Sequence, residues 1–404
     1  MKLKEKTVVE ELSGLKFKIR LVEPVNNQFA VITHEIQKNR NTNPYKFSKD
    51  TISYIEELLK NQYPNEEITQ ELAEDILQYL FVFKEEILFP APENPTFEFI
   101  DLFAGIGGFR LALQNLGGKC VFTSEWDEHA KKTYRANFGE TPFGDITKDE
   151  TKKHIPESFD ILCAGFPCQP FSSIGKRQGF LHATQGTLFN DILKIIKSKK
   201  IKSFLLENVG GLVTHDGGKT FKIIKAALEE AEFEIFDKIL DASDFGVPQQ
   251  RKRIYIVGFN KKLFVNENIE FKWPDKSLDK KYINLHLEKN VKGYSISKHL
   301  QEKYLFKKND GRPIIINYDS MVQVKTLVST YHKIQRLTGT FVKDGETGVR
   351  LLTEKECKAI MGFPEKFVIP VSRTQMYRQM GNSVAVPVIQ AVAKEMLAAL
   401  SNTK

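Results

Sequence analysis

The sequence predicts an α/β protein built on a parallel sheet with helices on both faces, for two reasons. First, five short apolar runs alternate with four helical patterns, which is typical of strand–helix–strand units. Second, a glycine-rich turn directly follows the first run. Right-handed crossovers bring the carboxyl ends of parallel strands to one edge, so we expect the ligand site there. The runs span 97–103, 119–124, 159–164, 202–206 and 252–258, and the helical patterns span 108–116, 127–137, 188–197 and 219–231.

The first 95 residues precede this alternation and have patterns of their own. Polar and apolar side chains alternate around a turn signal, which indicates a hairpin, and two helical patterns follow. Three prolines within residues 89–95 then indicate a linker. The expected elements are a strand at 16–22, a turn at Asn26-Asn27, a second strand at 28–35, and helices at 49–62 and 70–87 capped by Ser48 and Thr69.

Composition places the chain among folded globular proteins, because 41% of its 404 residues are apolar and 27% are charged. It contains no run of about 18 apolar residues, and its charged N-terminus lacks the apolar stretch of a secretion signal. We therefore expect a cytoplasmic protein that does not enter a membrane. The four cysteines include no Cys-x-x-Cys pair, so they predict neither a metal site nor a disulfide framework: Cys120, Cys163, Cys168 and Cys357.

The formal net charge of +8 is unevenly distributed. Residues 1–95 carry a net −4, whereas residues 261–349 carry a net +7. A lysine-rich solvated surface would explain this block, but a face that binds a polyanion would explain it equally well. We expect an accessory domain at 1–95, an α/β domain at 96–259, a basic, irregular domain at 260–349 and a helical segment at 350–404.

The glycine turn, Gly105-Ile106-Gly107-Gly108, links a buried strand to a helix. Glycines permit close approach of the backbone to a ligand, and a helix N-terminus favours an anionic group. Glu125 follows Gly105 by 20 residues, at the end of the next strand, where a carboxylate can accept ribose hydroxyls. The Gly-x-Gly-Gly spacing disfavours a dinucleotide site and a nicotinamide oxidoreductase. A purely structural turn is the alternative.

Cys168 lies in Gly-Phe-Pro-Cys-Gln-Pro-Phe-Ser, directly after the strand at 159–164. Most cysteines are small buried apolar residues. Here prolines on both sides stiffen the loop and keep Cys168 out of regular structure, which suits a nucleophile.

Two further strands carry charged side chains. Glu207 follows three apolar residues, so we expect burial and a raised pKa that would suit a general acid. Because side chains alternate along a strand, we expect Arg251 and Arg253 on the same face, where they could bind a phosphate or a carboxylate. Ordinary surface charges are the alternative for all three. Gly381-Asn382-Ser383, before an apolar helix, is a weak signal by itself.

Taken together, these segments resemble the cytosine-5 DNA methyltransferase family over about 96–259 and 350–404. The resemblance rests on Asp-Leu-Phe-Ala-Gly-Ile-Gly-Gly, Gly-Phe-Pro-Cys-Gln-Pro-Phe-Ser, Glu-Asn-Val, Gln-x-Arg-x-Arg and Gly-Asn-Ser-Val in the family order, with 350–363 as a further family-like block. It implies a Rossmann-like S-adenosylmethionine-dependent methyltransferase sheet, a smaller irregular target-recognition domain at 260–349, and double-stranded DNA as substrate.

The resemblance also implies residue roles. Cys168 would attack carbon 6 of a flipped-out cytosine, Glu207 would protonate ring nitrogen 3, and Arg253 with Arg251 would support the base, its phosphate and Glu207. The cofactor residues would be Phe103, Ala104, Gly105, Gly107, Gly108, Glu125, Trp126, Asp145, Ile146, Pro167, Asn382 and Ser383. DNA contacts would come from Gln169, Ser172, Lys176, Arg177, Thr326, Tyr331, Lys333, Gln335 and Arg336.

Three questions stay open at this point. A transfer-RNA cytosine methyltransferase of the same family is a second possibility, although the long basic region favours DNA. Some family members regulate transcription through an N-terminal helix-turn-helix, but residues 1–95 are acidic, and a dimerisation module is equally open. The family further implies a companion restriction endonuclease, and we expect a monomer on DNA.

Overall fold

The structure is a computed structural model that describes the chain from residue 87 onward almost completely. It describes the strands 5–12 and 15–22, the single residues 30, 34, 52, 53, 56, 57, 60, 69, 70 and 73, and the ranges 87–167, 188–264 and 269–401. Five of the predicted site residues lie outside this part of the chain: Cys168, Gln169, Ser172, Lys176 and Arg177.

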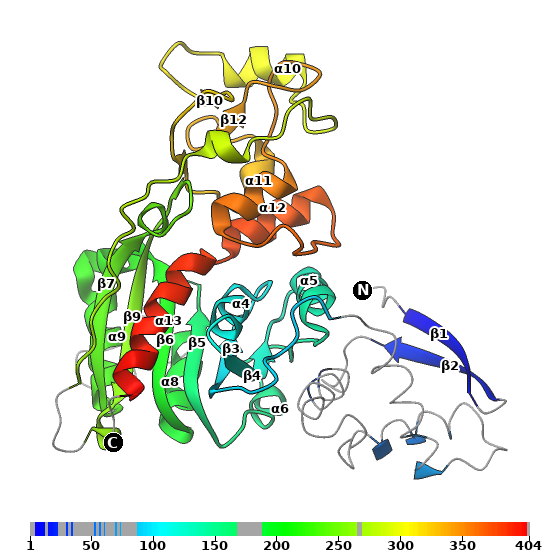
Figure 1. Cartoon of the computed structure of the whole chain (residues 1–404), viewed down its shortest axis with the longest axis vertical. Helices are drawn as coiled ribbons and strands as arrows, with labels where there is room; N and C mark the ends of the chain where they lie inside the picture. Colours follow the sequence, from blue (N-terminus) through cyan, green and yellow to red (C-terminus); the bar gives the residue numbers. More distant parts are fainter. Residues whose placement is uncertain are drawn as a thin grey trace.

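A six-stranded sheet with the order β4-β3-β5-β6-β9-β7 forms the centre of the molecule (Figure 1). All five predicted strands are confirmed, and β7 is an addition that the sequence pattern did not show. Its side chains are mostly half-buried at the sheet edge, so it lacks the apolar run of a buried strand. The strands are β3 (Phe97–Leu102), β4 (Gly118–Ser124), β5 (Ser158–Gly165), β6 (Lys200–Val209), β7 (Phe233–Asp241) and β9 (Lys252–Asn260).

The sheet is mixed, which corrects the prediction of a purely parallel one. Strand β9 runs antiparallel to both β6 and β7. The connection from β7 to β9 spans only 242–251, and it contains one short 3-10 turn and the two-residue strand β8 (Gln249–Gln250). A parallel return needs a crossover of a dozen or more residues, so this short connection imposes an antiparallel strand.

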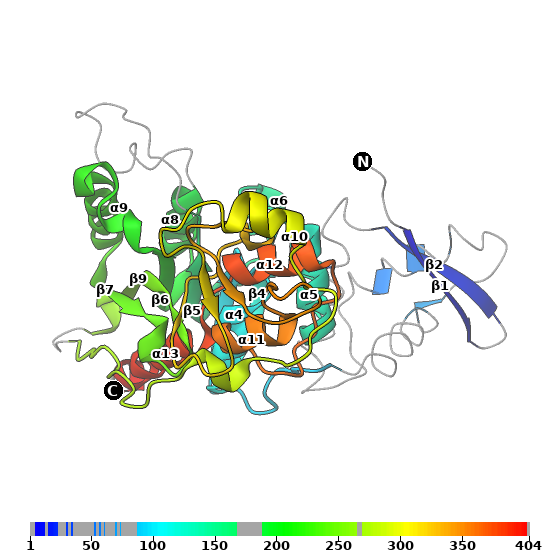
Figure 2. The same cartoon turned by 90° about the horizontal axis from the view of Figure 1, so that it is seen from above.

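Helices cover both faces of the sheet, as predicted. On one face, α4 (Gly108–Gln114) and α13 (Val386–Ser401) share an apolar core with the sheet, and on the other face α8 (Leu188–Ser198) and α9 (Lys219–Glu230) do so (Figure 2). Alternate strand residues feed the two cores: Phe99 contributes to the first and Ile100 to the second. Helices α5 (Glu128–Phe138) and α6 (Asp149–Lys152) lie near β4 (Figure 1).

A second lobe, built from short elements, lies beyond the carboxyl ends of the strands (Figure 1). Two short parallel pairings occur in or beside it, β10 with β12 and β11 with β8. Helices α11 and α12 connect this lobe to α13. The bounds are α10 (Lys298–Leu300), β10 (Ile314–Ile316), β11 (Val324–Lys325), β12 (Thr340–Val342), α11 (Glu354–Met361) and α12 (Arg373–Asn382).

One helical stretch, Arg373–Ser401, is long and apolar enough to span a membrane by length and composition alone. It consists of α12 and α13, which are separated by the extended residue Ser383. The apolar residues Val388, Ile389, Val392 and Met396 of α13 are fully buried in the core against the sheet. Their burial accounts for the hydropathy of this stretch.

In the N-terminal region, β1 (Glu5–Leu12) pairs antiparallel with β2 (Leu15–Val22). The strand at 16–22 is therefore confirmed, but the second strand predicted at 28–35 is wrong. Ala30 and His34 are helical, and β2 takes its partner from the preceding residues, where Leu12 pairs with Leu15 in a tight hairpin. Helices were predicted at 49–62 and 70–87. The residues before 87 that the structure describes within these two ranges are helical, as predicted.

Candidate active site

A cavity of about 680 Å³ opens at the carboxyl ends of β3, β4, β5 and β6. It is lined by residues that follow each of these strands and by the C-terminal half of α12. The expected catalytic residues Glu207, Arg251 and Arg253 line it. The expected cofactor residues that line the same cavity are Phe103, Gly105, Glu125, Trp126, Asp145, Ile146, Pro167, Asn382 and Ser383.

Glu125 is fixed at the end of β4 by three backbone N–H groups. Gly105 donates to its Oε2 at 2.8 Å, and Trp126 and Asp127 each donate to its Oε1 at 2.8 Å. Burial raises the pKa of Glu125, and these hydrogen bonds oppose that rise. The glycine turn and the carboxylate are thus one unit, with the remaining lone pairs of Glu125 free to accept hydroxyl groups.

An apolar wall stands next to this carboxylate. Phe103 lines the cavity with a φ of 55°, a left-handed conformation that is uncommon for a bulky residue and is often found at functional sites. Ile146 and the 77% exposed Trp126 complete the wall. Asp145 is held by the backbone N–H of Thr147, which donates to its Oδ1 at 2.9 Å. Apolar surfaces beside fixed carboxylates suit a nucleoside, with its flat base and ribose hydroxyls.

Three of the expected cofactor residues shape the turn without lining the cavity: Ala104, Gly107 and Gly108. Gly107 begins α4 in the left-handed conformation, and an added Cβ would lie 2.3 Å from the ring of Phe138. Ala104 is buried, and its N–H donates to the carbonyl of Ser124 at 2.9 Å. These three residues thus lie in or beside the turn that begins α4, next to the residues that line the cavity.

Glu207 and Arg253 form an ion pair at the cavity, with Oε1 and Nε 3.1 Å apart. The antiparallel register places Val209 opposite Arg253, so the beginning of β9 meets the end of β6. Burial raises the pKa of Glu207, and the charges of Arg253 and Arg251 partly oppose this rise. Burial therefore shifts Glu207 in the direction that favours its protonated form, as a general acid requires.

Arg251 behaves differently from Arg253. It precedes β9, and it is only 3% exposed. Its guanidinium donates to three backbone carbonyls, those of Leu327 at 3.2 Å, Gly381 at 3.1 Å and Ser383 at 2.6 Å. Both arginines line the cavity, but the three carbonyl contacts of Arg251 also join the second lobe to the end of α12.

Asn208 was missed by the sequence analysis, although it stands next to Glu207. Its side-chain amide donates to the carbonyl of Phe166 at 2.9 Å, and its Oδ1 accepts the N–H of Val209. Phe166 and Pro167 line the cavity and lead directly to Cys168. Asn208 therefore ties the end of β6 to the segment that precedes the cysteine.

Helix α12 supplies three further lining residues that were not predicted, Gln375, Arg378 and Gln379. The hydroxyl of Thr133 donates to Gln379 Oε1 at 2.9 Å, which fixes this helix against α5. A signal was present in the sequence, since all three residues lie within about two helical turns of Gly381-Asn382-Ser383.

Two of the expected DNA contacts are corrected, because their side chains are buried and fully engaged within the lobe. Arg336 pairs with Asp310 and donates to the carbonyls of Leu305, Lys308 and Arg312. Tyr331 is 2% exposed, and its hydroxyl donates to the carbonyl of Thr340 at 2.5 Å.

The other three residues of this group are accessible to different degrees. Thr326 donates to the carbonyl of Gln250 at 2.8 Å, and Gln335 donates to the hydroxyl of Thr330 at 2.8 Å. Lys333 is exposed. Of the described candidates, Lys333 is thus the one that presents a free-standing charge to solvent.

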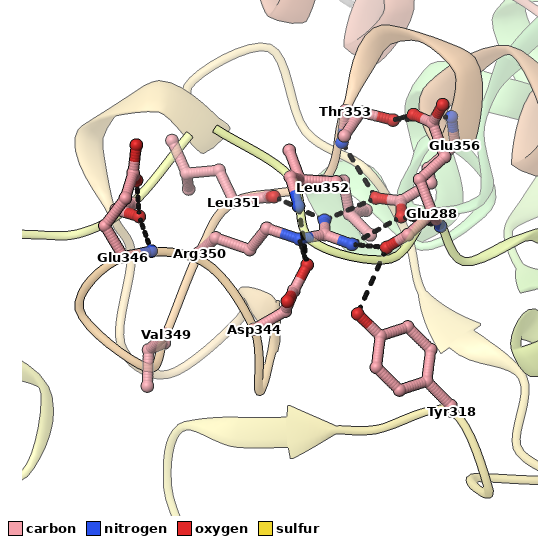
Figure 3. Close-up of polar contacts among 12 residues, drawn as sticks. Glu288, Tyr318, Asp344, Glu346, Val349, Arg350, Leu351, Leu352, Thr353 and Glu356 are labelled. Carbon is pink, nitrogen blue, oxygen red and sulfur yellow. Dashed lines mark hydrogen bonds and ion pairs between the residues drawn. The ribbon is translucent and has the colours of Figure 1, made fainter. Parts of the chain in front are cut away.

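A buried cluster around Arg350 connects the lobe to α11 (Figure 3). The fully buried guanidinium of Arg350 makes a bidentate pair with Glu356, at 2.8 Å for both bonds, and its Nε lies 2.9 Å from Asp344. It also donates to the carbonyl of Glu288 at 2.7 Å. Residues 288 and 344, near both ends of the lobe, are therefore held by one side chain.

The chain matches a known protein family over most of its length. A family model described as C-5 cytosine-specific DNA methylase matches residues 97–398. The chain belongs to this family. It is a DNA cytosine-5 methyltransferase of the restriction-modification type, and the Cys168, Glu207 and Arg253 segments all lie within the matched range.

Curated relatives of this methyltransferase are bacterial. The chain is 60% identical over 307 residues to the Type II methyltransferase M.MspI of Moraxella sp, covering 76% of this chain and 72% of that protein. It is 48% identical over 344 residues to the Type II methyltransferase M.HpaII of Haemophilus parainfluenzae, covering 78% and 94%.

Solved structures agree on the fold. The methyltransferase EhMeth of Entamoeba histolytica superimposes with a TM-score of 0.59 at 22% identity, covering 75% of this chain and 98% of that one. The Dnmt2 methyltransferase of S. pombe gives 0.58 at 21% identity, covering 76% and 99%.

Proposed function

We propose that this methyltransferase transfers a methyl group from S-adenosylmethionine to carbon 5 of a flipped-out cytosine in duplex DNA, by way of a Cys168 adduct. The observation that carries the proposal is the pair of buried Glu207 with half-buried Arg253, which faces the same cavity as the fixed carboxylate Glu125. One cavity thus offers a proton donor for a base and acceptors for a nucleoside.

Cys168 is the nucleophile in this scheme. The other three cysteines are buried, and burial raises the pKa of each thiol, to about 11 for Cys120, so they stay protonated and unreactive. The Cys168 thiolate forms a bond to carbon 6 of cytosine. Carbon 5 then takes the methyl group and loses its proton to water, the carbon–sulfur bond breaks to restore the thiolate, and ring nitrogen 3 returns its proton to Glu207. The adduct divides one difficult step into easier ones.

Glu207 supplies the proton that makes this attack feasible. With its pKa raised by burial, the carboxyl group donates to ring nitrogen 3 and draws electron density away from carbon 6. Arg253 orients the carboxyl group through their 3.1 Å contact. Asn208 is a positioning residue, since its bond to Phe166 fixes the segment that leads to Cys168.

S-adenosylmethionine supplies an activated methyl group when bound. Glu125 would accept its ribose hydroxyls, and Phe103 and Ile146 would contact its adenine. Trp126, Asp145 and Asn382 line the same part of the cavity and would complete the binding site.

Residues 260–349 serve as the target-recognition domain between the catalytic domain at 96–259 and the segment at 350–404. Flipping a base costs a few kcal/mol, and contacts of a basic surface with phosphates offset that cost. Lys333 is one such contact, while Arg251 and Arg350 hold the domain in place. A companion endonuclease of the same specificity, action as a monomer on DNA, and a cytoplasmic location complete the proposal.

The test measures transfer of labelled methyl groups to duplex DNA and to transfer RNA, together with a map of 5-methylcytosine in an expressing host. We expect one short methylated DNA motif, and we expect Cys168→Ala to abolish transfer while DNA binding persists. Activity confined to transfer RNA, or methylation by Cys168→Ala, would overturn the proposal.

A further inference from the structure

His34 places the N-terminal region in contact with the catalytic domain. Its imidazole is 10% exposed, its Nδ1 lies 2.8 Å from the carbonyl of Ala30, and its Nε2 lies 3.3 Å from Oε1 of Glu140. Ala30 is 3% exposed. Ala30 and His34, which precede the family-matched range, are therefore largely shielded from solvent, and His34 contacts Glu140, which follows α5.

The ring of His34 packs on an aromatic stack. Its centroid lies 4.6 Å from that of Phe143, which in turn stacks on Phe122 at 4.9 Å and on His154 at 4.7 Å. Phe122 belongs to β4 and His154 follows α6. His34 thus closes one side of a cluster that fixes the Phe143 ring.

The backbone of Phe143 is hydrogen-bonded to the end of β4, directly before the residues that line the cavity. Its N–H donates to the carbonyl of Thr123 at 2.8 Å, and its carbonyl accepts the N–H of Glu125 at 2.9 Å. Gly144, Asp145 and Ile146 follow directly and line the cavity. Residues 139–147 contain no helix, and a single β-bridge between Phe143 and Ser124 joins them to the sheet, so their position also depends on side-chain packing.

Glu140 extends this contact to α4. Its other oxygen pairs with the fully buried Arg110 of α4, the helix that the glycine turn begins. Arg110 also donates to the hydroxyl of Tyr134 at 3.1 Å and to Gln114 at 2.6 Å. His34 therefore touches both supports of the cavity, the 139–147 segment and, through Glu140, α4.

We propose that His34 is a positioning residue for the cofactor, and that the N-terminal region braces the 139–147 wall from behind. This inference rests on the proposed binding of S-adenosylmethionine in the cavity. Removing the imidazole would leave a void beside Phe143, so the wall that carries Asp145 and Ile146 would lose part of the packing that fixes its position.

The test uses full-length His34→Ala and measures the Kd for S-adenosylmethionine by calorimetry, with steady-state kinetics alongside. We expect the Kd and the KM for the cofactor to rise about tenfold, the order expected for losing one buried contact of about 1.4 kcal/mol. The kcat at saturating cofactor and the KM for DNA stay within twofold. Hydrogen exchange should increase selectively in residues 139–147.

Two further variants keep the test decisive. His34→Gln keeps a polar side chain at this position but not the ring, so its Kd should rise about threefold, and it replaces His34→Ala if that variant does not fold. Lys60→Ala is the matched control, because Lys60 is an exposed helical residue of the same region that pairs with Glu56, and it should bind as the wild type does.

The outcomes separate the two proposals. No cofactor binding by the wild-type chain would refute the proposed function. Normal binding by the wild type together with an unchanged Kd in folded His34→Ala or His34→Gln would refute the brace alone. A lower kcat with an unchanged Kd would do the same.

Discussion

Arg253 lies 3.1 Å from Glu207 because β9 runs antiparallel to β6. A parallel β9 would carry its first residues to the opposite edge of the sheet, away from the carboxyl end of β6. The reversal of this one strand therefore assembles the acid and its partner, although the two residues are 46 positions apart in the sequence.

Glu207→Gln should lower kcat by about 10²–10⁴-fold, the usual contribution of a positioned acid or base, because an amide cannot give a proton to ring nitrogen 3. Binding of the cofactor, measured by calorimetry, should stay unchanged. Glu229→Gln, on the exposed side of α9, is the matched control and should be fully active. Methylation at the wild-type rate by the Glu207→Gln variant would remove Glu207 from the mechanism.

The pH dependence of kcat should report the raised pKa of Glu207. Burial raises this pKa above the ordinary carboxyl value, so the protonated form persists to higher pH than in an exposed glutamate. If the protonated form is the active one, kcat should fall as the pH rises through that value. Glu207→Gln should lack this limb of the profile, and a profile identical in both proteins would contradict the assignment.

Alanine substitutions of Arg251 and Arg253 should have different effects on stability and on kcat. Arg251→Ala leaves three carbonyls without a donor and should lower the free energy of unfolding by about 3 kcal/mol. Arg253→Ala removes a residue at the cavity and should reduce kcat with a smaller loss of stability. Urea unfolding and methyl transfer distinguish the two variants, and equal destabilisation would show that Arg253 is also structural.

Arg350→Ala should destabilise the protein by roughly 3–5 kcal/mol, the usual cost of leaving a buried charge unpaired. Replacing its partner as well, in Arg350→Ala with Glu356→Gln, should cost less than the sum of the two single variants. Lys355→Ala breaks an exposed pair with Glu365 and should cost less than about 1 kcal/mol. Additive losses in denaturant unfolding would show that Arg350 and Glu356 act independently.

Asp101 should make stability depend on pH. Its carboxyl group is fully buried, and burial raises its pKa to about 8, although the charge of the neighbouring Arg110 opposes the rise. The folded state then holds a proton that the unfolded state releases, so the free energy of unfolding falls as the pH rises from about 4 to 8, by at most about 1.4 kcal/mol per unit.

Asp101→Asn should abolish this component and become more stable relative to the wild type as the pH rises. Asp149→Asn, whose side chain is fully exposed, serves as the control and should leave the slope unchanged. Parallel pH profiles of the Asp101→Asn variant and the wild type would show that Asp101 is ionised in the folded protein.

Local sequence determined much of this protein. The apolar runs specified five of the six central strands, and the residues directly after them specified where Glu125 and Glu207 stand, because parallel strands end at a common edge. The motif order was sufficient to indicate the family. Half-buried β7 escaped detection because an edge strand needs no continuous apolar run, and the strand predicted at 28–35 failed because β2 found a partner upstream.

Only the tertiary structure decided which charged residues lie at the candidate active site and which stabilise the fold. Arg251, Arg253 and Arg336 are the same residue type and look equivalent in the sequence. In the structure, Arg253 pairs with buried Glu207 at the cavity, while the other two donate hydrogen bonds to backbone carbonyls inside the protein. A guanidinium takes its role from the partners that surround it, and those partners come from distant segments. The same reason kept the contact of His34 with Glu140 hidden, because nothing in either local pattern indicates that the two side chains meet.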